Sequence, residues 1–201
     1  MDISLEIAQA AARLIVDEGL DYGSAKRLAV KQLGLPPRSP MPGNDEVEVQ
    51  VREHIAIFHA DTQPGELAAL RALALRWMER LAEFRPHLSG AVWHGTATRM
   101  SDIHLQLFCD DSKSAEIALI DQQIHYQPAT VTGMHGRPVE ALTVVVRSRE
   151  LASEVAVHLM VYDHDDLRGA LKPDAQGRVP RGDLQAVRNL VSAAQAQGGT
   201  A

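Results

Sequence analysis

The sequence has a single cysteine, few aromatic residues and no long uninterrupted run of apolar residues. One thiol, Cys109, excludes an internal disulfide and any zinc site built from two or more thiolates, and it favours a reducing compartment. With aromatic residues at 4%, the core has to be mainly aliphatic. No stretch approaches the roughly 18 apolar residues of a membrane-spanning helix, and the acidic N-terminus is unlike a secretory signal. We therefore expect a cytoplasmic protein with no membrane partner.

The chain also lacks an excess of positive charge, because its 20 Lys and Arg residues are outnumbered by 26 Asp and Glu residues, which gives a formal net charge of −6. Binding to nucleic-acid phosphates needs clustered Lys and Arg, so nucleic acid is not the expected partner. Apolar residues make up 45% of the chain, which is enough for an ordinary globular core. The length suits one domain, or one domain with a helical extension.

The first half of the chain has helical periodicity. Apolar residues recur at spacings of three and four, which predicts helices over residues 4–16, 24–33, 45–59 and 66–84. The prolines and glycine of PPRSPMPGN (36–44) break both kinds of regular structure. We therefore expect a helical segment over 1–35, a linker over 36–44 and a second helical segment over 45–85.

The second half changes to the two-residue alternation of strands. The clearest case is DIHLQLF (102–108), and other strands are expected to start at residue 90 and to cover 124–132, 141–148 and 155–162. Helices first and strands later predict an α+β fold, with helices covering a mixed or antiparallel sheet. The sheet domain is expected over 86–195, followed by a disordered tail over 196–201.

One stretch of this half, AVWHGTATRMSDIHLQLF (91–108), carries a motif. An apolar segment ends at Gly95 and Thr96, a short polar connection follows, and Ser101 and Asp102 open the alternating strand. This resembles the signature of the nucleotidyltransferase superfamily, the polymerase-beta-like fold. There, a Gly-Ser turn after the first strand precedes a Ser-Asp-x-Asp strand. The resemblance covers about residues 86–165 and implies a nucleotidyltransferase core.

The resemblance also implies a chemistry. Members of the family hold two Mg²⁺ ions with carboxylates on adjacent strands, and the ions bind the nucleoside triphosphate and activate an acceptor hydroxyl. Side chains at i and i+2 of a strand point to one face, so both can reach one ion. By this resemblance Gly95, Thr96 and Ser101 hold the nucleotide, and Asp102 is the catalytic, metal-binding carboxylate.

Histidine stands at the other two carboxylate positions. His104 follows Asp102 at i+2, and His158 is the central polar residue of the strand expected over 155–162. The set Asp102, His104 and His158 suits Zn²⁺, Mn²⁺, Fe²⁺ or Ni²⁺ better than Mg²⁺, which prefers oxygen ligands. The expected cofactor is therefore a divalent metal, either Mg²⁺ or a transition ion, and the expected ligand is a nucleoside triphosphate.

Three interpretations of this departure stay open. The chain is a relative that binds nucleotide or a partner without catalysis, a nucleotidyltransferase with altered metal use, or a coincidence of pattern. We favour the nucleotidyltransferase fold with weakened or lost nucleotidyl transfer. Each residue also has a structural interpretation: Asp102 as a strand-entry residue, the two histidines as half-buried strand residues, and Gly95 as a turn.

Two other classes of function compete with this one. The segment IAQAAARLIVDEG (7–19) resembles the first helix of TetR-type transcription regulators, and Lys26, Arg27 and Lys31 form a small basic cluster after it. This resemblance implies a DNA-binding helix-turn-helix, although the linker over 36–44 stands where a third helix belongs. The other class is a non-enzymatic interaction module that reuses the fold.

Overall fold

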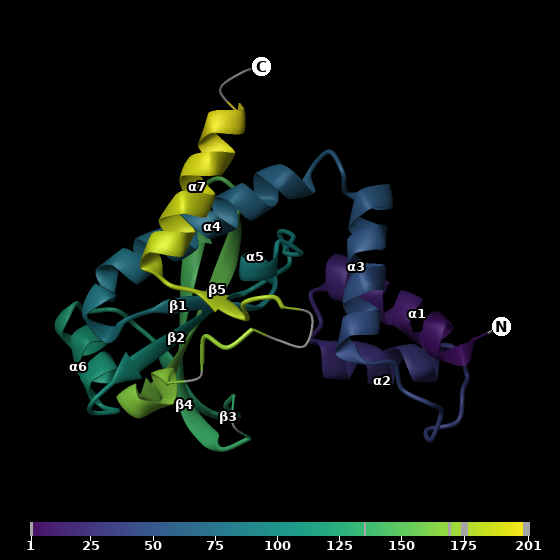
Figure 1. Ribbon diagram of the computed structural model, residues 1–201, viewed down its shortest axis with the longest axis horizontal. Helices are drawn as coiled ribbons and strands as arrows, with labels where there is room; N and C mark the ends of the chain where they lie inside the picture. Colours follow the sequence, from purple (N-terminus) through teal and green to yellow (C-terminus); the bar gives the residue numbers. More distant parts are fainter. Residues whose placement is uncertain (1, 135, 169, 174–176, 199–201) are drawn as a thin grey trace. The chain divides into compact units, whose positions relative to one another are not determined.

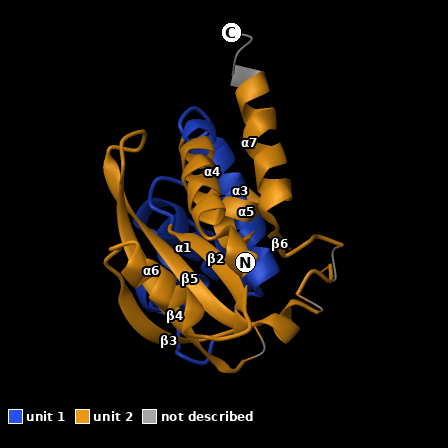
Figure 2. Ribbon diagram, turned by 90° about the vertical axis from the view of Figure 1, so that its left-hand side faces the viewer, with its two compact units in different colours: residues 1–65, 96–101 blue, residues 66–95, 102–201 orange. Residues whose placement is uncertain are grey.

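The computed structural model describes residues 2–134, 136–168, 170–173 and 177–198 and shows helices followed by a mixed sheet (Figure 1). The chain divides into two compact units (Figure 2). The first unit consists of residues 1–65 and 96–101, and the second of residues 66–95 and 102–201. Among the described residues, no helix combines the length and the apolar character needed to cross a membrane.

The first unit is helical. It contains α1 (Ile3–Glu18), α2 (Tyr22–Gln32), α3 (Asn44–Phe58) and the first residues of α4 (Gln63–Arg80). Its buried core is aliphatic and is drawn from the apolar faces of the first three helices: Ile7, Ala8, Ala11, Ala12, Leu14, Val16, Ala25, Ala29, Val30, Val47, Val51 and Ile55. The helical periodicity of the sequence therefore marks the side chains that become buried.

The ends of α1 are fixed by local bonds. The Ser4 backbone N–H donates to Oδ1 of Asp2, the N-cap residue, at 3.0 Å. At the other end Gly19 adopts the left-handed conformation with φ of 72°, and its N–H donates to the Ile15 carbonyl at 3.1 Å. The helix therefore stops just after Asp17.

The second unit is built on a six-stranded sheet of order β3-β4-β5-β2-β1-β6. Its strands are β1 (His87–Ser89), β2 (Ile103–Cys109), β3 (Gln127–Thr132), β4 (Pro138–Ser148), β5 (Ser153–Asp163) and β6 (Arg181–Gly182). β2 and β5 are parallel, and the other neighbouring strands are antiparallel. The sheet is therefore mixed, with its one parallel pair at the centre.

The second unit also contains helices, which precede, separate and follow these strands along the chain. They are the main part of α4, the 3-10 helix η1 (Ala82–Phe84), α5 (Gly90–His94), α6 (Ser114–Asp121), the 3-10 helix η2 (His164–Leu167) and α7 (Leu184–Gly198). In Figure 1, α7 passes across α4, and an ion pair joins Arg188 to Glu79 at 3.0 Å. On β2, the side chains of Ile103, Leu105 and Leu107 are fully buried.

The fold class expected from the sequence, α+β with N-terminal helices and a mixed sheet, is confirmed. The boundaries differ in places. Residues 66–85, expected in a helical segment, belong with the sheet unit, whereas residues 96–101 belong with the helical unit. The expected tail over 196–201 starts inside α7, and its last three residues lie outside the described part of the chain.

The prediction of a strand that starts at residue 90 is wrong, because β1 ends at Ser89 and α5 starts at Gly90. Gly90 turns the chain with φ of +71°, a left-handed conformation that favours glycine. Arg71 of α4 then donates from Nε to the Val92 carbonyl at 3.1 Å and from Nη2 to the Trp93 carbonyl at 3.2 Å. This cap comes from a distant side chain, so local periodicity does not reveal it.

Candidate functional site

Polar side chains meet on one face at the centre of the sheet. Asp102 directly precedes β2, and the parallel register places His104 of β2 beside His158 of β5. The antiparallel register then places Thr143 of β4 on the other side of His158. Residues opposite one another in a sheet point to the same face. We call Asp102, His104, His158 and Thr143 the sheet cluster.

His158 is the centre of the sheet cluster. Its Nε2 lies 3.2 Å from Oδ2 of Asp102, and its Nδ1 lies 2.9 Å from Oγ1 of Thr143. An ionised carboxylate only accepts, so Nε2 carries a proton and donates to Asp102. In the neutral ring Nδ1 then accepts from the Thr143 hydroxyl. The hydrogen bonds therefore select one tautomer of His158 and fix the plane of its ring.

The imidazole of His104 stacks on that of His158. The ring centroids are 4.9 Å apart and the planes differ by 22°. Burial lowers the pKa of His104 below 6.5, and the neighbouring charge of His158 lowers it further, while Asp102 acts in the opposite direction. His104 is therefore a neutral ring at pH 7.

Asp102 is held ionised. The hydrogen bond from His158 lowers the pKa of the Asp102 carboxyl from 3.8, against the opposing effect of burial. The Asp102 side chain is 49% exposed and that of His158 is 27% exposed. The sheet cluster is thus accessible to a ligand at its Asp102 end.

The sheet cluster is part of a row that crosses all six strands. Register places one residue of each strand in the row, and every one is polar: Gln127, Thr143, His158, His104, Ser89 and Arg181. We call these residues the polar row. The row runs from the exposed Gln127 to the buried Ser89 and Arg181, so it gives one face of the sheet a continuous strip of hydrogen-bonding groups.

Two buried polar atoms near the polar row have no hydrogen-bond partner in the structure: Nε of Arg181 and Oε1 of Gln106. Arg181 is 9% exposed and Gln106, two residues after His104 on β2, is 6% exposed. Burial lowers the pKa of Arg181 from its ordinary value. A buried guanidinium with an unpaired N–H favours an anion, and an unpaired amide oxygen favours a donor or a bound water.

Two of the three residues expected to hold the nucleotide, Gly95 and Ser101, shape the local backbone, and the third, Thr96, is buried. Gly95 adopts φ of 84° and ends α5. Thr96 is 5% exposed. Ser101 Oγ accepts from the Thr98 N–H at 3.0 Å, which closes a turn. Thr96 and Ser101 belong to the first unit and Gly95 to the second. Their role in phosphate binding stays a prediction.

The donor set of the sheet cluster does not fit Mg²⁺. One carboxylate and two imidazoles offer a single hard oxygen site, whereas Mg²⁺ requires octahedral oxygen coordination. Both ring nitrogens of His158 already contact Asp102 and Thr143. A transition ion at Asp102, His104 and His158 stays a prediction. Their ligand atoms do not all lie within 4.8 Å of one another, so an ion would require side-chain movement as well as the loss of one of these hydrogen bonds.

A surface hollow of about 310 Å³ lies elsewhere on the second unit. It is lined by residues that include Arg85, His87, Asp183 and Arg188, and not by the sheet cluster. His87 is 5% exposed, and burial lowers its pKa below 6.5. The hollow and the sheet cluster are therefore separate features of the second unit.

Comparison of the chain with protein families, with curated proteins and with solved structures found no match. The candidate site therefore stands on its geometry. The strand alternation of 102–108 places Gln106 on the face of Asp102 and His104, but sequence analysis did not find Thr143 or Arg181. The one available signal was Thr143, a polar residue within the apolar strand ALTVVVRS; Arg181 lies in a two-residue strand that has no periodicity.

Proposed function

We propose that the polar row binds the phosphate groups of a nucleoside triphosphate. In this proposal the chain is a nucleotidyltransferase relative with weakened or lost nucleotidyl transfer. The observation that carries the proposal is the register of β2 and β5. This register places His104 beside His158, and Oδ2 of Asp102 lies 3.2 Å from Nε2 of His158. The resemblance of residues 91–108 to the nucleotidyltransferase signature supports it.

The residues of the polar row would act as donors. Arg181 supplies a guanidinium with an unpaired Nε, and the neutral imidazole of His104 supplies an N–H donor to phosphate oxygens. Asp102 orients His158 through its hydrogen bond. Since the donor set does not fit Mg²⁺, the arrangement favours binding over metal-assisted transfer.

Nucleotide binding is tested by thermal unfolding of the full chain with ATP, CTP, GTP or UTP. Each nucleotide is added alone and with Mg²⁺, Mn²⁺ or Zn²⁺, and each mixture is compared with the metal alone. At about 100 times the dissociation constant, the expected rise in Tm is roughly 5–10 °C. If no nucleotide raises Tm, the proposal is overturned and the interaction module is favoured.

The role of Asp102 is tested with Asp102→Ala, which should abolish any metal-dependent part of the nucleotide shift while the far-ultraviolet spectrum stays unchanged. Asp110→Ala, an exposed carboxylate just after β2, is the matched control and should retain the shift. An equal shift in Asp102→Ala and the parent chain would remove Asp102 from the site.

The convergence of the two histidines is tested by restoring carboxylates. The double variant His104→Asp with His158→Asp should make the nucleotide shift respond to Mg²⁺, because three carboxylates on adjacent strands provide oxygen ligands. A Mg²⁺ response no larger than that of the parent chain would show that the three positions do not share an ion.

DNA binding remains the competing class. Lys26 donates from Nζ to the Pro42 carbonyl at 3.2 Å and to Asn44 Oδ1 at 2.9 Å, so part of the basic cluster is engaged within the first unit. Fluorescence anisotropy with duplex DNA at low and moderate salt separates the two classes. Affinity that falls steeply with salt would favour the regulator.

A further inference from the structure

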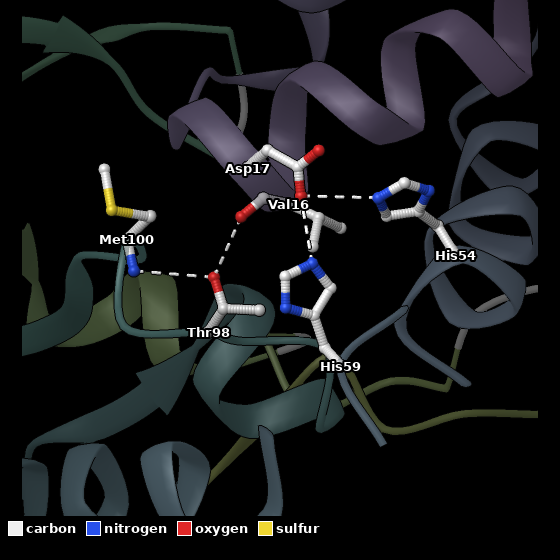
Figure 3. A network of polar contacts seen from close by, with 6 residues as sticks. All are labelled: Val16, Asp17, His54, His59, Thr98 and Met100. Atoms are coloured by element: carbon white, nitrogen blue, oxygen red, sulfur yellow. Dashed lines mark hydrogen bonds and ion pairs between the residues drawn. The ribbon is translucent and has the colours of Figure 1, made fainter. Parts of the chain in front are cut away.

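A second cluster of ligand-type side chains lies in the first unit, at the ends of two helices. Asp17 is in the last turn of α1, His54 is near the end of α3, and His59 is the residue that caps α3. Figure 3 shows both imidazoles directed at the same carboxylate oxygen. Nε2 of His54 lies 3.3 Å and Nε2 of His59 lies 3.0 Å from Oδ1 of Asp17. We call these three residues the helix-end cluster.

The spacing of the three atoms fits a metal ion. They all lie within 4.8 Å of one another, and within the described residues no other set of three His, Cys, Asp or Glu side chains does so. Two ligands of a tetrahedral zinc ion lie roughly 3.4 Å apart, because each is about 2.0–2.2 Å from the metal. The two distances from Oδ1 are close to this value, so an ion fits with small movements of the rings.

The chemistry of the ligands selects the class of ion. Two imidazole nitrogens and one carboxylate oxygen are ligands of Zn²⁺ and of other late transition ions, and such sets leave a position for water or substrate. Mg²⁺ and Ca²⁺ prefer oxygen throughout. Asp17 is 40% exposed, so an ion can enter from solvent on that side.

The electrostatics of the two helix ends also favour a cation. The C-terminal end of a helix carries partial negative charge, and both α1 and α3 end at the helix-end cluster. Neither helix has a basic residue in its last turn to offset this charge. Glu18, next to Asp17, adds a further negative charge in the sequence.

The ligands are held before any ion binds. The His54 ring packs on Phe58, one turn later in α3, with centroids 4.7 Å apart. The carbonyl of Val16, which precedes Asp17, accepts a hydrogen bond from Oγ1 of the buried Thr98 at 3.1 Å (Figure 3). Contacts of this kind fix the orientation of the side chains that bind the metal, so fewer side-chain conformations are lost when the ion binds.

We infer that the helix-end cluster is a site for a Zn²⁺-type transition ion, which joins the end of α1 to the end of α3 through Asp17, His54 and His59. The inference is independent of the nucleotide proposal, because the three residues lie in the first unit and the sheet cluster in the second. The alternative is a carboxylate that simply accepts hydrogen bonds from two imidazoles, and the experiment separates the two.

The test is a calorimetric titration of the chelator-treated full chain with ZnCl₂, with MgCl₂ as the comparison ion. One Zn²⁺ per chain and no Mg²⁺ binding are expected, with a Tm that rises with Zn²⁺ alone. Asp17→Asn is the decisive variant, because an amide oxygen still accepts from an imidazole N–H but is a poor ligand for Zn²⁺.

Asp17→Asn and His59→Gln should each weaken Zn²⁺ binding at least about 100-fold, since loss of a supporting residue alone costs 10–100-fold. His125→Gln, an exposed histidine of the second unit, should bind as the parent chain does. Circular dichroism of the metal-free variants checks that each is folded. Absence of stoichiometric Zn²⁺ binding, or equal affinity in Asp17→Asn, would overturn the inference. A titration changed by Asp102→Ala instead would place the ion at the sheet cluster and overturn it as well.

Discussion

The buried side chain of Thr98 forms two hydrogen bonds with the backbone of other residues. Its hydroxyl donates to the Val16 carbonyl at 3.1 Å and accepts from the Met100 N–H at 3.4 Å, and the residue is 2% exposed. The end of α1 leaves that carbonyl without a helical partner, because the Leu20 N–H bonds the Leu14 carbonyl instead. Thr98 therefore completes the bonding of a helix end from 82 residues away.

Thr98→Val should lower the free energy of unfolding by about 1–3 kcal/mol, because it leaves a buried carbonyl without a donor. The measurement is the urea midpoint at constant m-value. Thr98→Ser keeps the hydroxyl and should lose less than the valine variant. Equal losses in the two variants would show that packing of the methyl group, and not the hydrogen bond, carries the effect.

At the scale of residues, the strand alternation of 102–108 was enough to predict that Asp102 and His104 share a face. It could not predict Thr143 or Arg181, because cross-strand neighbours depend on the register of strands far apart in the sequence. The helix-end cluster was equally hidden. His54 and His59 are five residues apart, a spacing that does not share a helix face, and they meet only because the chain leaves the helix at His59.

Among the elements, the two-residue strand β6 packs closely against α5, with Gly182 next to the ring of Trp93. Gly182 pairs with Leu88, and a Cβ at position 182 would overlap the ring of Trp93 in α5. The indole Nε1 donates to the Val179 carbonyl at 2.8 Å, so the ring is fixed in place. Only a residue without a side chain lets β6 and α5 pack at this distance.

Gly182→Ala should therefore destabilise the chain by about 1–3 kcal/mol, the usual range for overpacking. Gly65→Ala in α4 is the matched control, because a Cβ there meets nothing within 4 Å. Alanine is the better helix former by up to about 1 kcal/mol, so this control should be neutral or stabilising. The Tm values of both variants give the comparison, and a neutral Gly182→Ala would show that the indole can move.

Long periodic elements were predictable from the sequence, and short ones were not. The helices α1 to α3 and the strands β2, β4 and β5 lie within a few residues of their expected positions, since their burial follows a repeating pattern. The strand β1 and the helix α5 are three and five residues long. Their form is set by the turn at Gly90 and by the cap from Arg71, which no local pattern contains.

For the whole molecule, buried histidines link stability to pH. Burial lowers the pKa values of His87 and His104 below 6.5 in the folded chain. The unfolded chain therefore binds protons more readily as the pH falls through 6.5, and folding stability falls with it until both folded residues also protonate.

Asp102 affects stability in a separate, more acidic pH range, because its pKa is lowered from 3.8. The stability that it provides is present above 3.8 and is lost as the pH falls through the lower folded value.

The chain should accordingly be less stable to urea at pH 5.0 than at pH 7.5, because the unfolded chain gains protons that the folded His87 and His104 do not accept as readily. His104→Gln should reduce this difference, whereas His125→Gln, which removes an exposed imidazole, should leave it unchanged. A pH dependence that is identical in the parent chain and in His104→Gln would contradict the assignment to His104.

Cys109 closes β2, and its position makes the strand open to direct observation. The thiol is 5% exposed, and burial together with the charges of Asp110, Asp111 and Glu83 raises its pKa to about 11. Alkylating reagents attack the thiolate, so the folded chain is protected both by packing and by the retained proton. The sequence has no second sulfhydryl, so the alkylation rate measures how often β2, which follows Asp102 and contains His104, detaches from its neighbouring strands.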